Sequence, residues 1–294
     1  MKNGGFTRTV DFYRSSCKNS FLATSVLALS ATVAAAEVKL SGDARMGVVY
    51  DGNAVANKLQ LTSRARVSFN MSGETDGGLA FGASFRADQA AIAANGNTAM
   101  TAGSVFVSGA FGKLTMGDTG SAADNVVGNV AGVGLTGLGD TNELGYLGNA
   151  KTAAKYEYST NGLTLAVSAG QSGSKDVSVA AKYSNDQYSV ALGYEDIGTD
   201  SQVTLGAGVK MNGVALEVRV ADRKSAANTA YAVSAAYTMD ATTVTAYMAS
   251  HRDGLSAYGI GASYDLGGGA KVVGGMAKVE GSKAKADLGL SFSF

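Results

Sequence analysis

Apolar and polar residues alternate along almost the whole chain after residue 36. The stretch from Leu59 to Met71 shows this rhythm most clearly. Its odd positions read Leu59, Leu61, Ser63, Ala65, Val67, Phe69 and Met71, and its even positions read Gln60, Thr62, Arg64, Arg66, Ser68 and Asn70. A period of two places one set on each face of a β-strand. The same split recurs in 163–167, 188–194, 203–209, 214–220 and 258–264, and it is less regular around Val105 and Val273. The pattern predicts an all-β fold whose strands have one apolar and one polar face.

Short turns separate these strands at regular intervals. Signals of this kind lie at 75–77, 111–112, 161–162, 185–186, 212–213, 240 and 267–269. From residue 161 onward they are about 24 to 28 residues apart, which fits two membrane-crossing strands of about 9 to 11 residues and one loop. An aromatic residue precedes four of the turns, where a membrane-surface girdle would place it: Tyr158, Tyr183, Tyr237 and Tyr264. Seven turns make eight hairpins, so the spacing predicts sixteen strands.

Two architectures share this alternation, a soluble β-sandwich and a membrane β-barrel. A sandwich needs large residues between its sheets, but the chain has no Trp and its apolar positions are mostly small and aliphatic. After residue 36 no apolar run approaches 18 residues, so only strands could span a membrane. We therefore predict a 16-stranded antiparallel transmembrane β-barrel with short periplasmic turns. Side chains cannot fill a barrel of that width, so a water channel would remain.

The first 36 residues follow a different pattern. Basic residues at Lys2, Arg8, Arg14 and Lys18 precede an apolar stretch at 21–29 and the sequence Ala34-Ala35-Ala36. This layout predicts a secretory signal peptide, 1–36, cleaved after Ala36, with 37–294 as a single barrel domain. The alternative, a membrane-anchoring helix, would need a longer apolar stretch to cross about 30 Å.

Composition after residue 36 restricts the chemistry. The only cysteine, Cys17, precedes that boundary, which excludes disulfides and thiolate metal sites from the mature chain. The mature chain would carry 20 basic and 23 acidic residues, a balance that gives no support to nucleic-acid binding.

One interval is nearly twice as long as the others. After a strand at 113–117, residues 118–150 are rich in Gly and lack alternation. A loop of this length is functional or disordered, and its apolar residues argue against a solvated segment. They are Val126, Val127, Val130, Val133, Leu135, Leu138, Leu144 and Leu147. An ordinary external loop is the alternative reading.

Four arginines stand on the polar face of three consecutive early strands. By alternation Arg45, Arg64, Arg66 and Arg86 all point into the lumen. Such residues can lie close together on neighbouring antiparallel strands, and cations this close need water or counter-charge beside them. They are candidates for a basic wall of the pore, or else lumen-facing charges that serve only solubility.

Five segments carry a family resemblance across the mature chain. They are 37–47, 63–69, 81–85, 108–113 and 259–270. In them the chain resembles the general diffusion porins of the alphaproteobacterial outer membrane, the Rhodobacter type. The resemblance implies a homotrimer in outer-membrane lipid of a Gram-negative bacterium, passing ions and small hydrophilic solutes by passive diffusion. It also implies that the long loop, the third, folds inward as the constriction loop.

In that family, acids on the inward loop face a basic wall and set up a transverse field. The loop of this chain offers only Asp118, Asp124, Asp140 and Glu143 for that role. With so few acids opposite the arginines, we expect weak selectivity or a mild preference for anions.

Other functions find little support. The only histidine, His251, falls in a predicted outer loop, with no sign of the serine and acid that a barrel hydrolase would need. The outer loops are short, which counts against an adhesin or binding barrel. No zinc-ligand spacing occurs, and the loop acids Asp196, Asp200 and Asp253 are only weak candidates for Ca²⁺. We therefore expect no enzyme and no cofactor.

Overall fold

The computed structural model describes residues 36–294, except for 92–97, 101–102, 149–152 and 172–173. The expected signal peptide, apart from Ala36, lies outside the described residues, as does the end of the expected loop at 149–150. Within the described part, no helix is long and apolar enough to cross a membrane.

Strands make up almost all of the described structure, with one short helix, α1 (Ala122–Val127). The strands are β1 (Glu37–Asp51), β2 (Leu59–Glu74), β3 (Ala80–Ala91), β4 (Thr98–Met100), β5 (Ser104–Gly109), β6 (Gly112–Gly117), β7 (Ala153–Thr160), β8 (Leu163–Ala169), β9 (Val177–Ser184), β10 (Tyr188–Asp196), β11 (Ser201–Met211), β12 (Val214–Arg223), β13 (Ala230–Met239), β14 (Thr242–Ser250), β15 (Ser256–Gly267), β16 (Ala270–Val279) and β17 (Lys285–Ser293).

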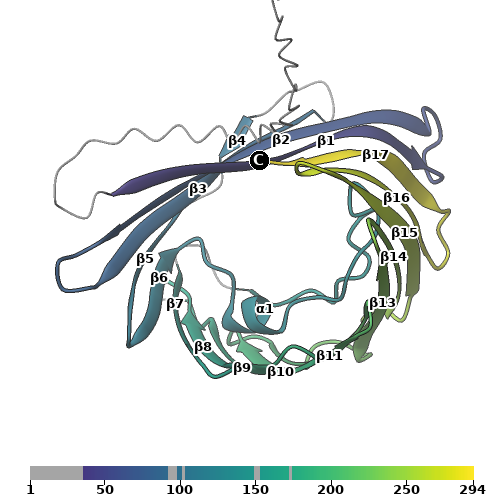
Figure 1. The fold of residues 1–294 in the computed structure, drawn as a ribbon. Helices are drawn as coiled ribbons and strands as arrows, with labels where there is room; N and C mark the ends of the chain where they lie inside the picture. The colour runs from purple at the N-terminus through teal and green to yellow at the C-terminus, as the bar shows by residue number, and fades with distance from the viewer. Residues whose placement is uncertain (1–35, 92–97, 101–102, 149–152, 172–173) are drawn as a thin grey trace, which may run out of the picture. The chain divides into compact units, whose positions relative to one another are not determined.

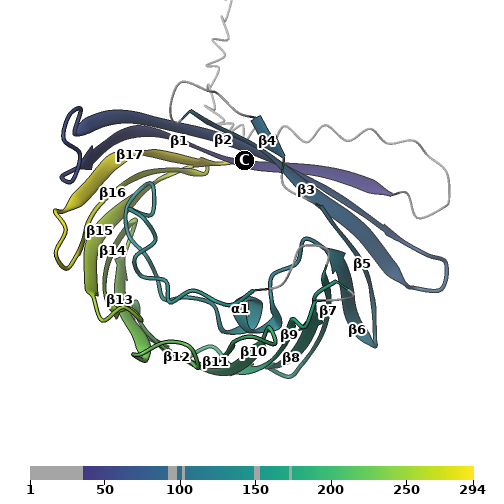
Figure 2. The ribbon, with the colours of Figure 1, turned by 180° about the vertical axis from the view of Figure 1, so that it is seen from behind.

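These strands form one closed antiparallel barrel. Consecutive strands pair with each other, and β1 pairs with both β2 and β17, which closes the sheet (Figures 1 and 2). The short β4 and the following β5 both pair with β3, at different heights, and so share one position in the barrel wall. The seventeen described strands therefore occupy sixteen positions, and the predicted fold is confirmed.

The alternation assigns the faces as expected. Large apolar side chains on the outward parity are exposed, as for Leu61 (86%) on β2 and Leu205 (52%) on β11. Lipid would cover this surface, because contact between apolar side chains and water is unfavourable. On the other parity the residues are polar or small and face the lumen.

The tight turns fall where the sequence predicts them. Asn161 and Gly162 join β7 to β8 with φ values of 47° and 81°, and Asn212 and Gly213 join β11 to β12 with 51° and 78°. Positive φ at both central residues is the geometry of the two-residue hairpin turn that matches strand twist. Despite its less regular pattern, Val105 lies in β5 and pairs with Ala83 on β3 and Met116 on β6.

Candidate functional site

The long segment after β6 lies inside the barrel, against its wall. Helix α1 begins this segment and packs on β8, β9, β10 and β11 (Figure 1). Ser121 caps the helix by accepting a hydrogen bond from the Asp124 amide at 3.1 Å. Ala122, Ala123, Val126 and Val127 are buried against the wall. The apolar residues of the loop thus pack inside the lumen, which argues against the alternative of an ordinary external loop.

Small residues on the lumen face of the wall make room for the loop. A Cβ on Gly193 of β10 would lie 2.7 Å from the Ala123 side chain, and a Cβ on Gly275 of β16 would lie 2.7 Å from the Gly134 amide nitrogen. Both are too close for real contacts, so these positions require glycine while the loop is in place. Buried alanines continue the same seat: Ala166, Ala180, Ala221, Ala230, Ala232, Ala249, Ala257 and Ala277.

Glu195 of β10 ties the start of the loop to its end. Its carboxylate accepts hydrogen bonds from the Ser121 hydroxyl at 2.5 Å, the Leu147 amide at 3.0 Å and the Gly148 amide at 3.1 Å. The side chain is only 1% exposed. A buried carboxylate is stable only when its oxygens are hydrogen-bonded, and here loop groups supply these bonds.

Asp287 of β17 holds the far end of the loop in a similar way. It accepts hydrogen bonds from the Leu135 amide at 2.9 Å, the Thr136 amide at 2.7 Å and the Thr136 hydroxyl at 2.6 Å. Beside it, Arg45 donates to the Leu135 carbonyl at 3.3 Å. The loop therefore follows the wall from β8 to β17 before it turns back.

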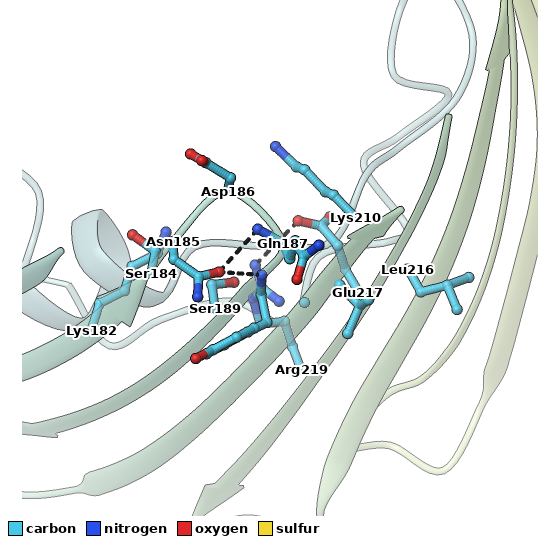
Figure 3. Close-up of a pocket in the computed structure, with 13 residues that line it drawn as sticks. Lys182, Ser184, Asn185, Asp186, Gln187, Ser189, Lys210, Leu216, Glu217 and Arg219 are labelled. Carbon is cyan, nitrogen blue, oxygen red and sulfur yellow. Dashed lines mark hydrogen bonds and ion pairs between the residues drawn. The ribbon is translucent and has the colours of Figure 1, made fainter. Parts of the chain in front are cut away.

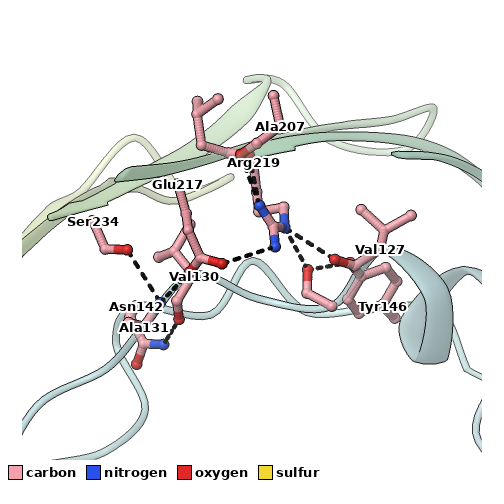
Figure 4. A network of polar contacts seen from close by, with 11 residues as sticks. Val127, Val130, Ala131, Asn142, Tyr146, Ala207, Glu217, Arg219 and Ser234 are labelled. Carbon is pink, nitrogen blue, oxygen red and sulfur yellow. Dashed lines mark hydrogen bonds and ion pairs between the residues drawn. The ribbon is translucent and has the colours of Figure 1, made fainter. Parts of the chain in front are cut away.

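A polar network on β12 fixes the middle of the loop (Figure 4). Arg219 donates to the carbonyls of Val127 at 3.0 Å and Gly128 at 3.1 Å, and it lies 3.7 Å from the Glu217 carboxylate. Glu217 in turn accepts from the Ala131 amide at 3.1 Å. One arginine thus satisfies the carbonyls at the C-terminal end of α1, which a short helix leaves without partners.

The returning arm of the loop is tied to the wall by further bonds. Tyr146 donates to the Gly128 carbonyl at 2.7 Å, and burial, the largest cause, raises the pKa of this phenol. Arg252 donates to the Gly145 carbonyl at 2.9 Å. The His251 ring bonds the Thr141 carbonyl at 2.9 Å. The lone histidine therefore contacts the loop backbone rather than a serine or a carboxylate.

The four predicted arginines are brought together on β1, β2 and β3, where two aspartates join them. Arg64 lies 3.0 Å and Arg66 4.0 Å from Asp43. Arg66 also lies 3.4 Å from Asp88, which accepts two bonds from Arg86, at 2.6 and 2.9 Å. The cluster comprises Arg45, Arg64, Arg66, Arg86, Asp43 and Asp88, and we call it the arginine wall.

The sequence reasoning missed both aspartates, although a signal existed. Asp43 stands two residues before Arg45, and Asp88 two residues after Arg86, so each shares the lumen parity of its arginine. The same parity marks Glu195, Glu217 and Asp287 as lumen residues. Parity does not show which residues these acidic side chains contact.

The predicted loop acids fall into two groups. Asp118 is exposed and lines a cavity of about 370 Å³ together with Arg86, Ser68 and Ser84. Asp124, Asp140 and Glu143 lie later in the same loop. In the described part of the chain, no hydrogen bond or ion pair joins these three to Arg45, Arg64 or Arg66.

The acids on the loop influence one another. Burial, the largest cause, raises the pKa of Asp124, as does the Glu195 carboxylate, while Lys155 lowers it. Burial also raises the pKa of Glu143, with further contributions from Asp140 and Asp124. Both carboxylates thus lose their charge at a higher pH than freely solvated acids would.

The candidate calcium ligands are occupied by protein groups. Asp200 lies 2.5 Å from Arg223 and also accepts from the Ser225 hydroxyl, and the arrangement holds the pKa of Asp200 well below its usual range. Asp196 accepts from the Gly198 amide and Asp253 from the Leu255 amide. Among the described residues, no group of three or more His, Cys, Asp or Glu side chains could hold a metal ion.

Comparisons with known proteins agree with one another. The family model described as Gram-negative porin matches residues 23–284. The chain is 38% identical to a porin of Rhodobacter capsulatus and 28% identical to a porin of Fuscovulum blasticum, each over 88% of this chain and 100% of the relative. A porin structure refined at 1.8 Å resolution aligns with a TM-score of 0.73 and 34% identity. A Rh. blastica porin variant aligns with a TM-score of 0.77 and 26% sequence identity. Both alignments cover 88% of this chain and 100% of the other chain.

Proposed function

Because the chain belongs to the Gram-negative porin family, we propose that the loop of 118–148 and the arginine wall bound the narrowest part of its pore. The protein is an outer-membrane porin of a Gram-negative bacterium, and it serves passive diffusion of ions and small hydrophilic solutes. The proposal concerns which residues restrict and select them.

The observation that carries the proposal is the double attachment of the loop. Glu195 on β10 and Asp287 on β17 accept hydrogen bonds from loop residues that are far apart along the loop. A loop held at two such places occupies part of the lumen. The open space is then left to the side of β1, β2 and β3, where the arginine wall lies.

The balance of charge supports weak selectivity with a mild preference for anions. Four guanidinium groups of the wall stand with two carboxylates, Asp43 and Asp88, in direct contact. This pairing shortens the reach of the positive field, but it leaves a net excess of positive charge. The opposing side carries few carboxylates, which are Asp118, Asp124, Asp140 and Glu143 on the loop.

A planar bilayer holding the purified protein under a KCl gradient tests this selectivity. We expect a small reversal potential with the sign of anion preference. It should be larger at low ionic strength, where the Debye length exceeds about 10 Å and the charges of the pore act over a longer distance. A clear cation preference in the same bilayers would contradict the proposed balance.

We also propose that the protein forms a homotrimer, is exported by a cleaved signal peptide and has no catalytic role. A homotrimer, which the family resemblance implies, would appear as conductance steps in groups of three. A secretory signal at 1–36 would appear as an N-terminus beginning at Glu37 in protein from outer membranes. No catalytic role is proposed, since the His251 ring bonds the loop backbone.

A further inference from the structure

A second polar cavity lies in the lumen, at the end of the barrel that carries the short turns. It has a volume of about 460 Å³ and is lined by β9, β10, β11 and β12 and by the turn at 185–187 (Figure 3). That size falls in the range of small-molecule sites. Arg219 and Glu217 line it as well as contacting the loop. The cavity therefore adjoins the loop.

Two lysines without ion-pair partners give the cavity a net positive charge, since Lys182, Lys210 and Arg219 line it together with only two carboxylates, Asp186 and Glu217. Lys182 of β9 and Lys210 of β11 both line it. In the part of the chain that the structure describes, neither ammonium group has a hydrogen bond or an ion pair. Asp186 also lines the cavity, but no ion pair joins it to either lysine. Of these two carboxylates, Glu217 is already engaged, because it accepts from the Ala131 amide and lies 3.7 Å from Arg219.

Neutral donors lie between the two lysines. Ser189 of β10 pairs with Ser184 on β9 and with Gly208 on β11. Lys182 is two residues from Ser184, and Lys210 is two residues from Gly208 in the opposite direction, so the lysines are offset by about 13 Å along the strands. The hydroxyls of Ser184 and Ser189 and the side-chain amide of Gln187 have no hydrogen-bond partner among the described residues. The lining thus offers positive charge at two separate places with free donors between them.

We propose that this cavity is a weak binding subsite for small hydrophilic solutes that carry carboxylate or phosphate groups. Ammonium groups bind such anions as point charges, and hydroxyl and amide donors suit the hydroxyl groups of a polar solute. Because the two lysines stand apart, a solute with two anionic groups binds more tightly than one with a single group. Weak binding of this kind draws a solute into a pore without trapping it. The inference rests on the porin function and adds a solute class to it.

The test measures channel conductance against anion concentration in planar bilayers, with potassium succinate and potassium acetate as probes at matched ionic strength. We expect conductance of the unchanged protein to saturate with succinate at lower concentration than with acetate. Lys182→Gln and Lys210→Gln should each raise the succinate concentration at half-saturation by roughly two- to fivefold. The double variant should show the same half-saturation for both anions.

The matched control is Lys224→Gln, which removes the same charge from an exposed residue outside the cavity. It should saturate like the unchanged protein. Circular dichroism of each variant checks that the barrel has formed. The subsite is overturned if the double variant keeps the succinate preference, or if Lys224→Gln lowers it equally. Stable KCl steps of the unchanged protein test the porin function separately, so the two failures are distinguishable.

Discussion

Replacement of Glu195 by Gln should loosen the loop of 118–148 at both of its ends. The carboxylate accepts three hydrogen bonds, from the Ser121 hydroxyl and the Leu147 and Gly148 amides. A glutamine can keep one acceptor oxygen toward Ser121 and Gly148, but its amide group then faces the Leu147 amide, and two donors meet. The change therefore removes one bond to a charged acceptor and weakens two others.

The size of the effect follows from these bonds. A hydrogen bond to a charged group contributes about 1.5–3 kcal/mol. One lost bond and two weakened ones amount to about 3 kcal/mol, which corresponds to roughly a hundredfold change in an equilibrium constant. Asp287 and Arg219 still hold the rest of the loop. We therefore expect the segment at 145–148 to leave the wall part of the time rather than the whole loop to unfold.

Single-channel recording is the assay. Glu195→Gln should show larger current noise and a broader spread of conductance levels, because the cross-section of the pore varies as the loop moves. Glu74→Gln is the matched control, since Glu74 is exposed beside a short turn, and it should leave the noise unchanged. Equal noise and conductance in Glu195→Gln and the unchanged protein would refute the view that this carboxylate fixes the loop.

Three further predictions concern charge in the pore. Arg64→Ala with Arg66→Ala should move the reversal potential toward cation preference, because the wall loses half of its guanidinium groups; reduced cation permeability would contradict this. Asp88→Asn should move it toward anions, because Arg66 and Arg86 lose their shared carboxylate; no change at low salt would argue against a role for the pair. As pH falls toward the raised pKa of Glu143, that carboxylate takes up a proton above the pH at which a freely solvated glutamate does, because of partial desolvation and the nearby Asp140 and Asp124, so anion preference should increase. Glu143→Gln should show that preference already at neutral pH, and an unaltered pH profile would count against the assignment.

Several features of the site could be read from parity alone. Alternation places Arg45, Arg64, Arg66 and Arg86 in the lumen, and the structure brings them together on β1, β2 and β3. The long interval after β6 predicted an unusual loop, and seven of its eight Val and Leu residues are buried inside the barrel, with Leu147 partly exposed. The helix α1 within that loop was not predicted, because six residues are too few for a periodic signal.

The sequence by itself determined the barrel, because the pattern that specifies it is local. A two-residue period assigns each strand its faces, and turn residues such as Asn161 and Gly162 separate the strands. Tertiary structure alone decided where the long loop lies. The loop is held by pairs such as Leu135 with Asp287, 152 residues apart, and Leu147 with Glu195, 48 apart. Such contacts form only when the closed sheet brings distant lumen faces to the loop, and no local pattern records them.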